Sequence, residues 1–294
     1  MQARLTTRAP AKINLSLRIL GRRADGYHEL DSLVAFAGVG DQLTLLPGAE
    51  SGIAISGPFA EGLSVAADNL VLKAEVALRD QVPGLRSGGF LLVKRLPVAS
   101  GIGGGSADAA AALRLLARLN GLPSDAPALY AAAARIGADV PVCLAAKTRI
   151  MQGIGERLGS PLRLPRLFAL LVNPGVAVET AAVFRNLGLQ PGEATIQPAP
   201  ATDASWQGHA SAPSVIEALA ATRNDLEAPA RGAAPVIADV LELLAELPGC
   251  RLARMSGSGA TCFALFDDCR ASAAAAKLLA HRQPGWWIKP TVLG

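Results

Sequence analysis

The stretch from residue 97 to residue 112 combines glycine with small polar groups in a way that suits an anion. Four glycines stand in it, at Gly101, Gly103, Gly104 and Gly105. They leave the backbone amides without covering side chains. Ser106 follows them as the expected N-cap of an alanine-rich helix that runs to about residue 120. Because bare amides at the positive end of a helix attract phosphate, we predict a phosphate-binding loop here.

This loop matches neither of two familiar nucleotide motifs. A P-loop requires a lysine after the glycines, and none follows. The dinucleotide fingerprint requires a glycine where Ser106 stands and an acidic strand end about 20 residues later. The alternative is a flexible turn before an ordinary helix. An expected strand at 89–95 joined directly to the helix favours the phosphate site, since linkers seldom lie inside such a unit.

A lysine and an aspartate in apolar surroundings are candidates for catalysis. Lys12 begins an alternating stretch over 12–20, after a break expected at 9–11, and a solvated strand face is the ordinary interpretation. Asp139 precedes Val140 and Pro141, where an N-cap is the ordinary interpretation. The functional alternative is a carboxylate that accepts a proton from a reacting hydroxyl. The residues alone leave both alternatives open.

Two further groups could recognise a ligand. Tyr27 and His28 follow a turn signal at Asp25 and Gly26, and they suit either recognition or loop packing. The segment 256–260 is a second glycine-rich turn that resembles an anion nest. Such turns are common between strands, so this segment is weak evidence by itself.

Composition indicates a folded chain of two domains. The 294 residues are 51% hydrophobic and 18% charged, which excludes a disordered chain. We place the domain boundary near residues 160–166 and expect a long loop over 188–214. The net charge is only +4 and aromatic residues make up 4%, which argues against a stacking surface for nucleic acid. A mild positive charge suits a small anionic substrate.

Cysteine and histidine spacing argues against metal and disulfide chemistry. The four cysteines form no Cys-x-x-Cys pair, and the three histidines lie far apart. We expect free thiols. The first residues contain no apolar signal-peptide core, and no stretch of 18 uncharged residues could span a bilayer. We therefore expect a cytoplasmic protein with no nucleic-acid or membrane partner and no obligate protein partner.

Several stretches together carry a family resemblance. Three of them resemble the motifs of the GHMP kinase superfamily in the correct order, at 9–15, 97–112 and 255–261. Others resemble the branch of that superfamily that acts on a cytidine diphosphate-linked methylerythritol, at 23–29, 68–70, 94–97, 137–142 and 224–227. The resemblance covers nearly the whole chain and fails only within 188–214.

The resemblance implies an α+β fold of two domains and a phosphoryl transfer. An ATP-binding N-terminal domain with a left-handed β-α-β unit would cover residues 1–162, and a ferredoxin-like C-terminal domain would cover 163–294. The γ-phosphoryl of ATP would pass to the 2-hydroxyl of the methylerythritol moiety, in the non-mevalonate route to isoprenoids. Mg²⁺ is expected as the counter-ion of ATP, with its protein ligands unassigned. The alternatives are another small-molecule kinase of the superfamily and a non-catalytic nucleotide sensor.

The resemblance also implies roles for individual residues. Asp139 would act as general base, and Lys12 would stabilise developing charge. ATP-binding positions would be Asn69, Lys94, Pro97, Val98, Ala99, Ser100, Gly101, Ile102, Gly103, Gly104, Gly105, Ser106 and Ala107. Substrate-binding positions would be Asn14, Tyr27, His28, Thr180 and Phe184. The second glycine loop would contribute Gly257, Ser258 and Gly259.

Overall fold

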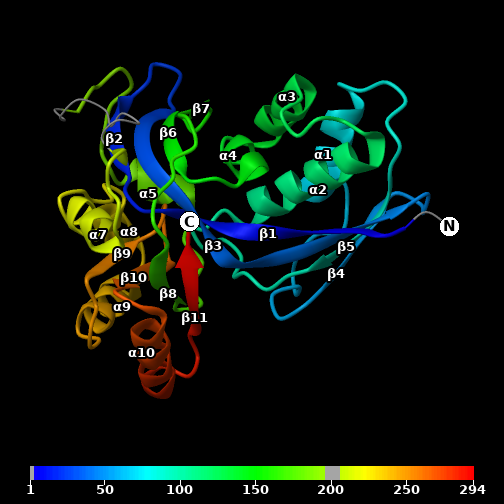
Figure 1. The fold of residues 1–294 in the computed structure, drawn as a ribbon. Helices are drawn as coiled ribbons and strands as arrows, with labels where there is room; N and C mark the ends of the chain where they lie inside the picture. Colours follow the sequence, from blue (N-terminus) through cyan, green and yellow to red (C-terminus); the bar gives the residue numbers. More distant parts are fainter. Residues whose placement is uncertain (1–2, 196–205) are drawn as a thin grey trace. The chain divides into compact units, whose positions relative to one another are not determined.

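The computed structural model describes residues 3–195 and 206–294 (Figure 1). The chain divides into two compact units, and neither is a single continuous stretch. Unit 1 is formed by residues 1–11, 39–98 and 103–146, and unit 2 by residues 12–38, 99–102 and 147–294. Two long strands, β1 (Leu5–Asn14) and β3 (His28–Pro47), run through both units. The predicted domains 1–162 and 163–294 stay a prediction, because compactness divides the chain within these strands instead.

Unit 1 combines a small sheet with four helices. Strand β5 (Gly88–Val93) pairs in parallel with β4 (Gly52–Ser56) and antiparallel with residues 42–47 of β3. The helices are α1 (Leu70–Arg79), α2 (Gly104–Asn120), α3 (Pro127–Ile136) and α4 (Val140–Ala145). Helix α2 packs against the other three. Four consecutive buried alanines, 109–112, give it a narrow surface against which its neighbours can pack closely.

Unit 2 is built on an antiparallel sheet in the order β11 (Trp287–Leu293), β8 (Leu167–Asn173), β10 (Cys262–Phe266) and β9 (Leu252–Met255). Strands β2 (Arg18–Arg22) and β6 (Arg149–Gly153) pair with the first half of β3, and β7 (Arg157–Leu158) pairs with β6. Within the described residues, the helices of this unit include α5 (Thr180–Arg185), α7 (Ala212–Ala220), α8 (Glu227–Ala233), α9 (Val236–Ala245) and α10 (Cys269–Arg282). Buried apolar residues of β8 and β10 form the centre of this sheet.

The expected strand break at residues 9–11 is wrong. Strand β1 continues through Pro10 to Asn14, and the interruption comes at residues 15–17. The polar side of this region is also buried, with Lys12 4% exposed and Asn14 1% exposed. Period-two alternation separates two sides of a strand, but it does not say which side meets water. Here the polar side finds polar partners inside the fold.

The expected N-cap at Ser106 is also wrong. Helix α2 begins at Gly104 and its N-cap is Gly103, whose φ of 63° lies in the left-handed region. Glycine adopts that conformation without steric cost, which allows the helix to start before the serine. Ser106 is instead the third residue of the helix and is half-buried.

The structure bears on three other expectations, which concern the long loop, the cysteines and membrane spans. Helix α7 begins at Ala212, inside the loop expected over 188–214, whereas residues 196–205 of that loop lie outside the described residues. All four cysteines are free, as expected. Among the helices of the described residues, none has the length and apolar character needed to cross a bilayer.

Candidate functional site

The second half of the glycine-rich loop lies in unit 1, where it opens helix α2. A Cβ on Gly104 would lie 3.2 Å from the Lys94 ammonium, so the first residue of the helix packs directly over that cation. The first-turn amides of an α-helix have no partners within the helix. The amide of Ala107 already donates to the carbonyl of Gly103 at 2.8 Å, so residues 103–106 are the ones whose amides can face an anion. Phosphate binding by this loop stays a prediction.

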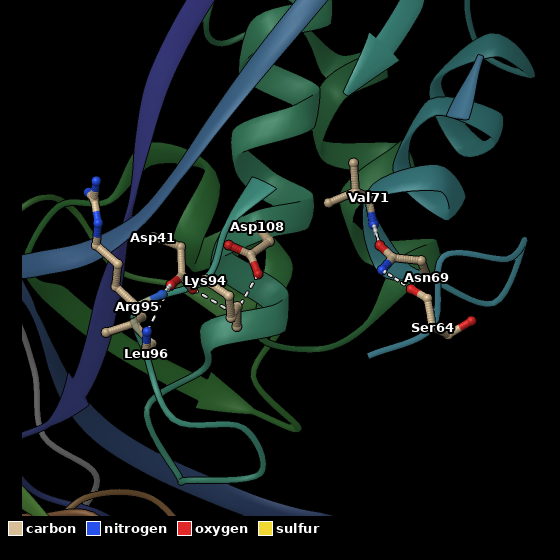
Figure 2. A network of polar contacts seen from close by, with 8 residues as sticks. All are labelled: Asp41, Ser64, Asn69, Val71, Lys94, Arg95, Leu96 and Asp108. Carbon is tan, nitrogen blue, oxygen red and sulfur yellow. Dashed lines mark hydrogen bonds and ion pairs between the residues drawn. The ribbon is translucent and has the colours of Figure 1, made fainter. Parts of the chain in front are cut away.

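Lys94 lies between two buried carboxylates (Figure 2). Its Nζ is 2.6 Å from Asp41 Oδ2 and 2.6 Å from Asp108 Oδ2. The other oxygen of Asp41 accepts hydrogen bonds from the backbone amides of Arg95, at 2.5 Å, and Leu96, at 2.8 Å. By contrast, Asp108 Oδ1 is buried and has no hydrogen-bond partner among the described residues. The cluster thus contains one satisfied carboxylate and one half-satisfied carboxylate.

Burial and charge act against each other within this cluster. Burial alone lowers the pKa of Lys94, but attraction to Asp108 and Asp41 outweighs it and the pKa is raised. For Asp108 the balance goes the other way. Burial and the charge of Asp41 raise the pKa of Asp108, and they outweigh the attraction to Lys94, so this pKa is about 7. Lys94 therefore remains a cation near neutral pH, whereas Asp108 changes its charge there.

Asn69 and Asp139 are the other candidate side chains of unit 1. Asn69 caps helix α1: its Oδ1 accepts from the amide of Val71 at 2.9 Å, and its Nδ2 donates to the carbonyl of Ser64 at 2.7 Å (Figure 2). Asp139 occupies the N-cap position of α4, yet its half-buried carboxylate accepts no capping hydrogen bond from that helix. The ordinary N-cap interpretation therefore does not account for the carboxylate of Asp139.

The half-buried residue Arg114 of α2 secures helix α4. Its guanidinium donates to the carbonyl oxygens of Cys143 at 2.8 Å and Leu144 at 3.3 Å, at the C-terminal end of α4. Burial lowers the pKa of Arg114, although it stays far above neutral pH for an arginine. This contact holds the short helix that Asp139 precedes.

Residues 99–102 of the loop lie in unit 2, where they pack against the second glycine-rich turn. A Cβ on Gly101 would lie 2.5 Å from the carbonyl oxygen of Ser256, and one on Gly257 would lie 2.6 Å from the carbonyl oxygen of Gly101. Only glycine permits the two backbones to approach so closely. The amide of Thr261 also donates to the carbonyl of Ser100 at 3.1 Å. The second turn therefore supports residues 99–102; its role as an anion nest stays a prediction.

Lys12 and Asn14 join this arrangement through β1. The backbone amide of Lys12 donates to the carbonyl of Ile102 at 3.0 Å. The Ser256 hydroxyl accepts from the amide of Asn14 at 3.1 Å and donates to the carbonyl of Gly101 at 3.2 Å. Asn14 Oδ1 is buried and lacks a hydrogen-bond partner in the part of the chain that the structure describes. Unit 2 thus brings a lysine and a polar amide oxygen to the first half of the loop.

The remaining predicted substrate residues also lie in unit 2. The rings of His28 and Phe184 have centroids 4.9 Å apart, at an interplanar angle of 37°. Thr180 Oγ1 and Ser258 Oγ form a hydrogen bond of 2.9 Å. Tyr27 is 60% exposed at the turn before β3. Burial, followed by the charge of Arg22, lowers the pKa of His28, so its imidazole is neutral near pH 7.

Several residues of these networks carried no signal in the sequence. Asp41 is a single acidic residue without a motif around it, and Asp108 lies within the glycine-rich stretch but was given no role there. Asn224 holds the second turn, because its Nδ2 donates to the carbonyls of Met255 at 2.9 Å and Gly257 at 2.8 Å. The stretch 224–227 contributed to the family resemblance, but its residue types alone did not indicate this contact.

No group of three or more histidine, cysteine, aspartate or glutamate side chains that could hold a metal ion occurs within residues 3–195 and 206–294. The buried carboxylates Asp41 and Asp108 are engaged with Lys94. The described side chains therefore do not form a protein cage for a divalent cation.

Comparison with known proteins gives consistent matches over the whole chain. Residues 69–147 match the family model of the GHMP kinases N terminal domain, and residues 211–282 match that of the GHMP kinases C terminal. The chain is 58% identical to 4-diphosphocytidyl-2-C-methyl-D-erythritol kinase of Methylobacterium radiotolerans, over 98% of this chain and 99% of that protein. It is 55% identical to the kinase of the same name from Xanthobacter autotrophicus, over 98% and 99%.

Solved structures agree with these relatives. A crystal structure of 4-(cytidine 5′-diphospho)-2C-methyl-D-erythritol kinase matches with a TM-score of 0.75 and 34% identity, covering 99% of each chain. Homoserine kinase from Cytophaga hutchinsonii matches with a TM-score of 0.69 at 17% identity, covering 99% of this chain and 95% of that one, which indicates a shared fold. Together these matches confirm the α+β fold with N- and C-terminal GHMP kinase parts that the sequence implied.

Proposed function

The chain belongs to the GHMP kinase family and, within it, to the 4-diphosphocytidyl-2-C-methyl-D-erythritol kinases, and on this premise we propose how its residues carry out the transfer. It is a phosphotransferase of a family that uses ATP. The γ-phosphoryl of ATP passes to the 2-hydroxyl of 4-diphosphocytidyl-2-C-methyl-D-erythritol. The oxygen of that hydroxyl attacks the γ-phosphorus, the bond to the bridging β–γ oxygen breaks, and ADP leaves.

The observation that carries the choice of acceptor is the ring pair of His28 and Phe184. These residues are far apart in sequence, yet their ring centroids lie 4.9 Å apart. The His28 Nε2 atom is buried without a hydrogen-bond partner among the described side chains and backbone groups. A flat base needs an aromatic face and an edge hydrogen bond, and this pair offers both to cytosine. Exposed Tyr27 adds a second aromatic group beside His28 in the sequence.

The methylerythritol end is assigned to Asn14 and Thr180. Asn14 Oδ1 has no partner within the described residues and can accept a hydrogen bond from a substrate hydroxyl. The hydroxyl of Thr180 forms a hydrogen bond with Ser258, and the backbone amide of Asn14 donates to Ser256. Asn14 and Thr180 therefore both contact the second glycine turn. A sugar-like alcohol is recognised through hydroxyl groups, which suits neutral amide and hydroxyl side chains.

Catalysis is assigned to Asp139 and Lys12. Asp139 accepts the proton of the attacking hydroxyl, a role supported by a carboxylate that does not cap its helix. Lys12 stabilises the charge that builds up on the transferred phosphoryl group. Its side chain is 4% exposed, and a cation acts more strongly in such a dry environment than in water.

The nucleotide is assigned to the loop at 97–107, whose amides and helix α2 dipole hold the phosphates. Asn69 and Lys94 flank this nucleotide region in our assignment. No group of three potential metal-binding side chains occurs in the described parts, so Mg²⁺ would be held chiefly by ATP oxygens and water, with at most one or two protein side chains. We assign it no protein ligand. When bound, it neutralises charge on the phosphates.

A coupled ADP-release assay tests this function. ATP and Mg²⁺ are supplied with 4-diphosphocytidyl-2-C-methyl-D-erythritol and, in parallel, with mevalonate, homoserine and galactose. Turnover with the cytidylated alcohol alone is expected. Turnover only with another alcohol would support the assignment as a kinase but contradict the substrate-binding roles of Tyr27, His28 and Phe184. Tight ATP binding without turnover of any acceptor would favour a nucleotide sensor.

A further inference from the structure

One buried ionic cluster contacts both ends of the phosphate loop. Before the loop, Asp41 Oδ1 accepts the amides of Arg95 and Leu96, the two residues that lead into Pro97. After the loop, Asp108 stands on helix α2, one turn beyond Gly104. Lys94 joins the two carboxylates through ion pairs of 2.6 Å each, as Figure 2 shows.

We propose that Asp41, Lys94 and Asp108 are positioning residues that clamp the two ends of the phosphate loop and thereby set the affinity for ATP. This inference rests on the proposed function, because it assigns the loop to the nucleotide. It goes further in giving Lys94 a role through its carboxylate partners instead of a direct contact with the nucleotide.

The geometry favours this indirect role for Lys94. An ammonium group has three donors, and two of them are taken by carboxylates at 2.6 Å. The side chain is buried, and the backbone of Gly104 packs over its end. With both carboxylates ionised, the cluster carries a net negative charge, so it is not a cationic site for phosphate. It fixes backbone positions instead.

The clamp has a direct consequence for the loop amides. Asp41 fixes residues 95 and 96, which follow strand β5, and Asp108 fixes the first turns of α2 relative to them. Amides bind an anion well only when they already point to a common centre. Loss of one link therefore lets the start of α2 shift and weakens ATP binding, while leaving the acceptor-binding residues of unit 2 unchanged.

Variants of Asp108 test the clamp by steady-state kinetics and by calorimetric titration with ATP. Asp108→Ala removes the link to Lys94 and is expected to raise the KM and Kd for ATP about tenfold, the size of one lost charge-assisted hydrogen bond. The KM for the acceptor is expected to stay within about twofold. Asp108→Asn keeps an acceptor oxygen for Lys94 and is expected to restore ATP affinity to within about threefold of the unmodified protein.

Glu75→Ala is the matched control. Glu75 is a buried carboxylate of unit 1 that accepts from Ser51 and pairs with Arg79, and neither partner belongs to the loop or to the Asp41–Lys94–Asp108 cluster. Its removal is expected to lower the midpoint of thermal unfolding without changing ATP affinity. The proposal is overturned if Asp108→Ala leaves ATP affinity unchanged, or if it weakens ATP and acceptor equally. If the unmodified protein binds ATP but turns over no acceptor, only the proposed function is contradicted. The clamp is still tested in that case, because calorimetric titration compares the ATP affinity of the variants without turnover.

Discussion

The two halves of the phosphate loop are supported by two different kinds of network. Residues 103–108, in unit 1, are supported by three buried charges, Asp41, Lys94 and Asp108. Residues 99–102, in unit 2, are supported by neutral groups, chiefly the Ser256 hydroxyl and the backbone of the second glycine turn. Each network is internal to its own unit.

The difference lies in what the loss of one member leaves behind. Removing one charge from a buried cluster exposes its partner to an apolar environment without compensation. Removing one neutral hydroxyl leaves only neutral groups unsatisfied, for Ser256 an amide and a carbonyl, which costs less than an unpaired buried charge. The charged network should therefore tolerate substitution less well and respond to pH, whereas the neutral network should lose stability in smaller steps.

Lys94→Met should produce the largest loss of stability. It leaves Asp41 and Asp108 facing each other without a cation, which is expected to lower the free energy of unfolding by about 3–5 kcal/mol. Denaturant titration measures the loss. Lys73→Met, an exposed lysine of α1, is the control and should change stability by about 0.5 kcal/mol or less. A loss for Lys94→Met as small as that of the control would show that the cluster is not held by its cation.

Asp108→Asn should change how stability depends on pH. Burial raises the pKa of Asp108 from 3.8 to about 7 in the folded state, so the folded state binds the proton more readily than the unfolded state. Its contribution to stability is therefore complete below about pH 4 and is lost as pH rises through about 7. From about pH 5 to about pH 7 the unmodified protein should lose about 2 kcal/mol relative to Asp108→Asn. Denaturation profiles that stay parallel would contradict this.

Ser256→Ala should have the smallest effect of the three. It removes the hydroxyl between Asn14 and Gly101 and is expected to lower the free energy of unfolding by about 1 kcal/mol. Ser272→Ala is the control, because that buried hydroxyl donates to the carbonyl of Cys269 within its own helix. A loss above about 3 kcal/mol for Ser256→Ala would remove the distinction between the two networks.

The sequence predicted the secondary structure best where a local signal acts alone. The strand expected at 89–95 and the alanine-rich helix expected to run to about residue 120 are found as β5 (Gly88–Val93) and α2 (Gly104–Asn120). The start of α2 was misplaced because Gly103 can adopt a left-handed conformation and cap the helix itself. The break at Pro10 was wrong because β1 continues through that residue.

The networks around the loop could not be predicted from one sequence. Lys94 was assigned through the family resemblance, but its two partners, Asp41 and Asp108, lie 53 and 14 residues away along the chain. Lys12 was expected on a solvated strand face and is buried instead. The contact between His28 and Phe184 likewise depends on tertiary structure, since a phenylalanine at helical spacing is usually a core residue.

The most direct test of the account is the turnover of Asp139→Asn with ATP and 4-diphosphocytidyl-2-C-methyl-D-erythritol. The asparagine keeps the shape of the side chain but cannot accept the proton of the attacking hydroxyl. We expect kcat to fall by about 10² or more, with the KM values for ATP and acceptor within about threefold of the unmodified protein. A kcat close to that of the unmodified protein would contradict the assignment of Asp139 as general base.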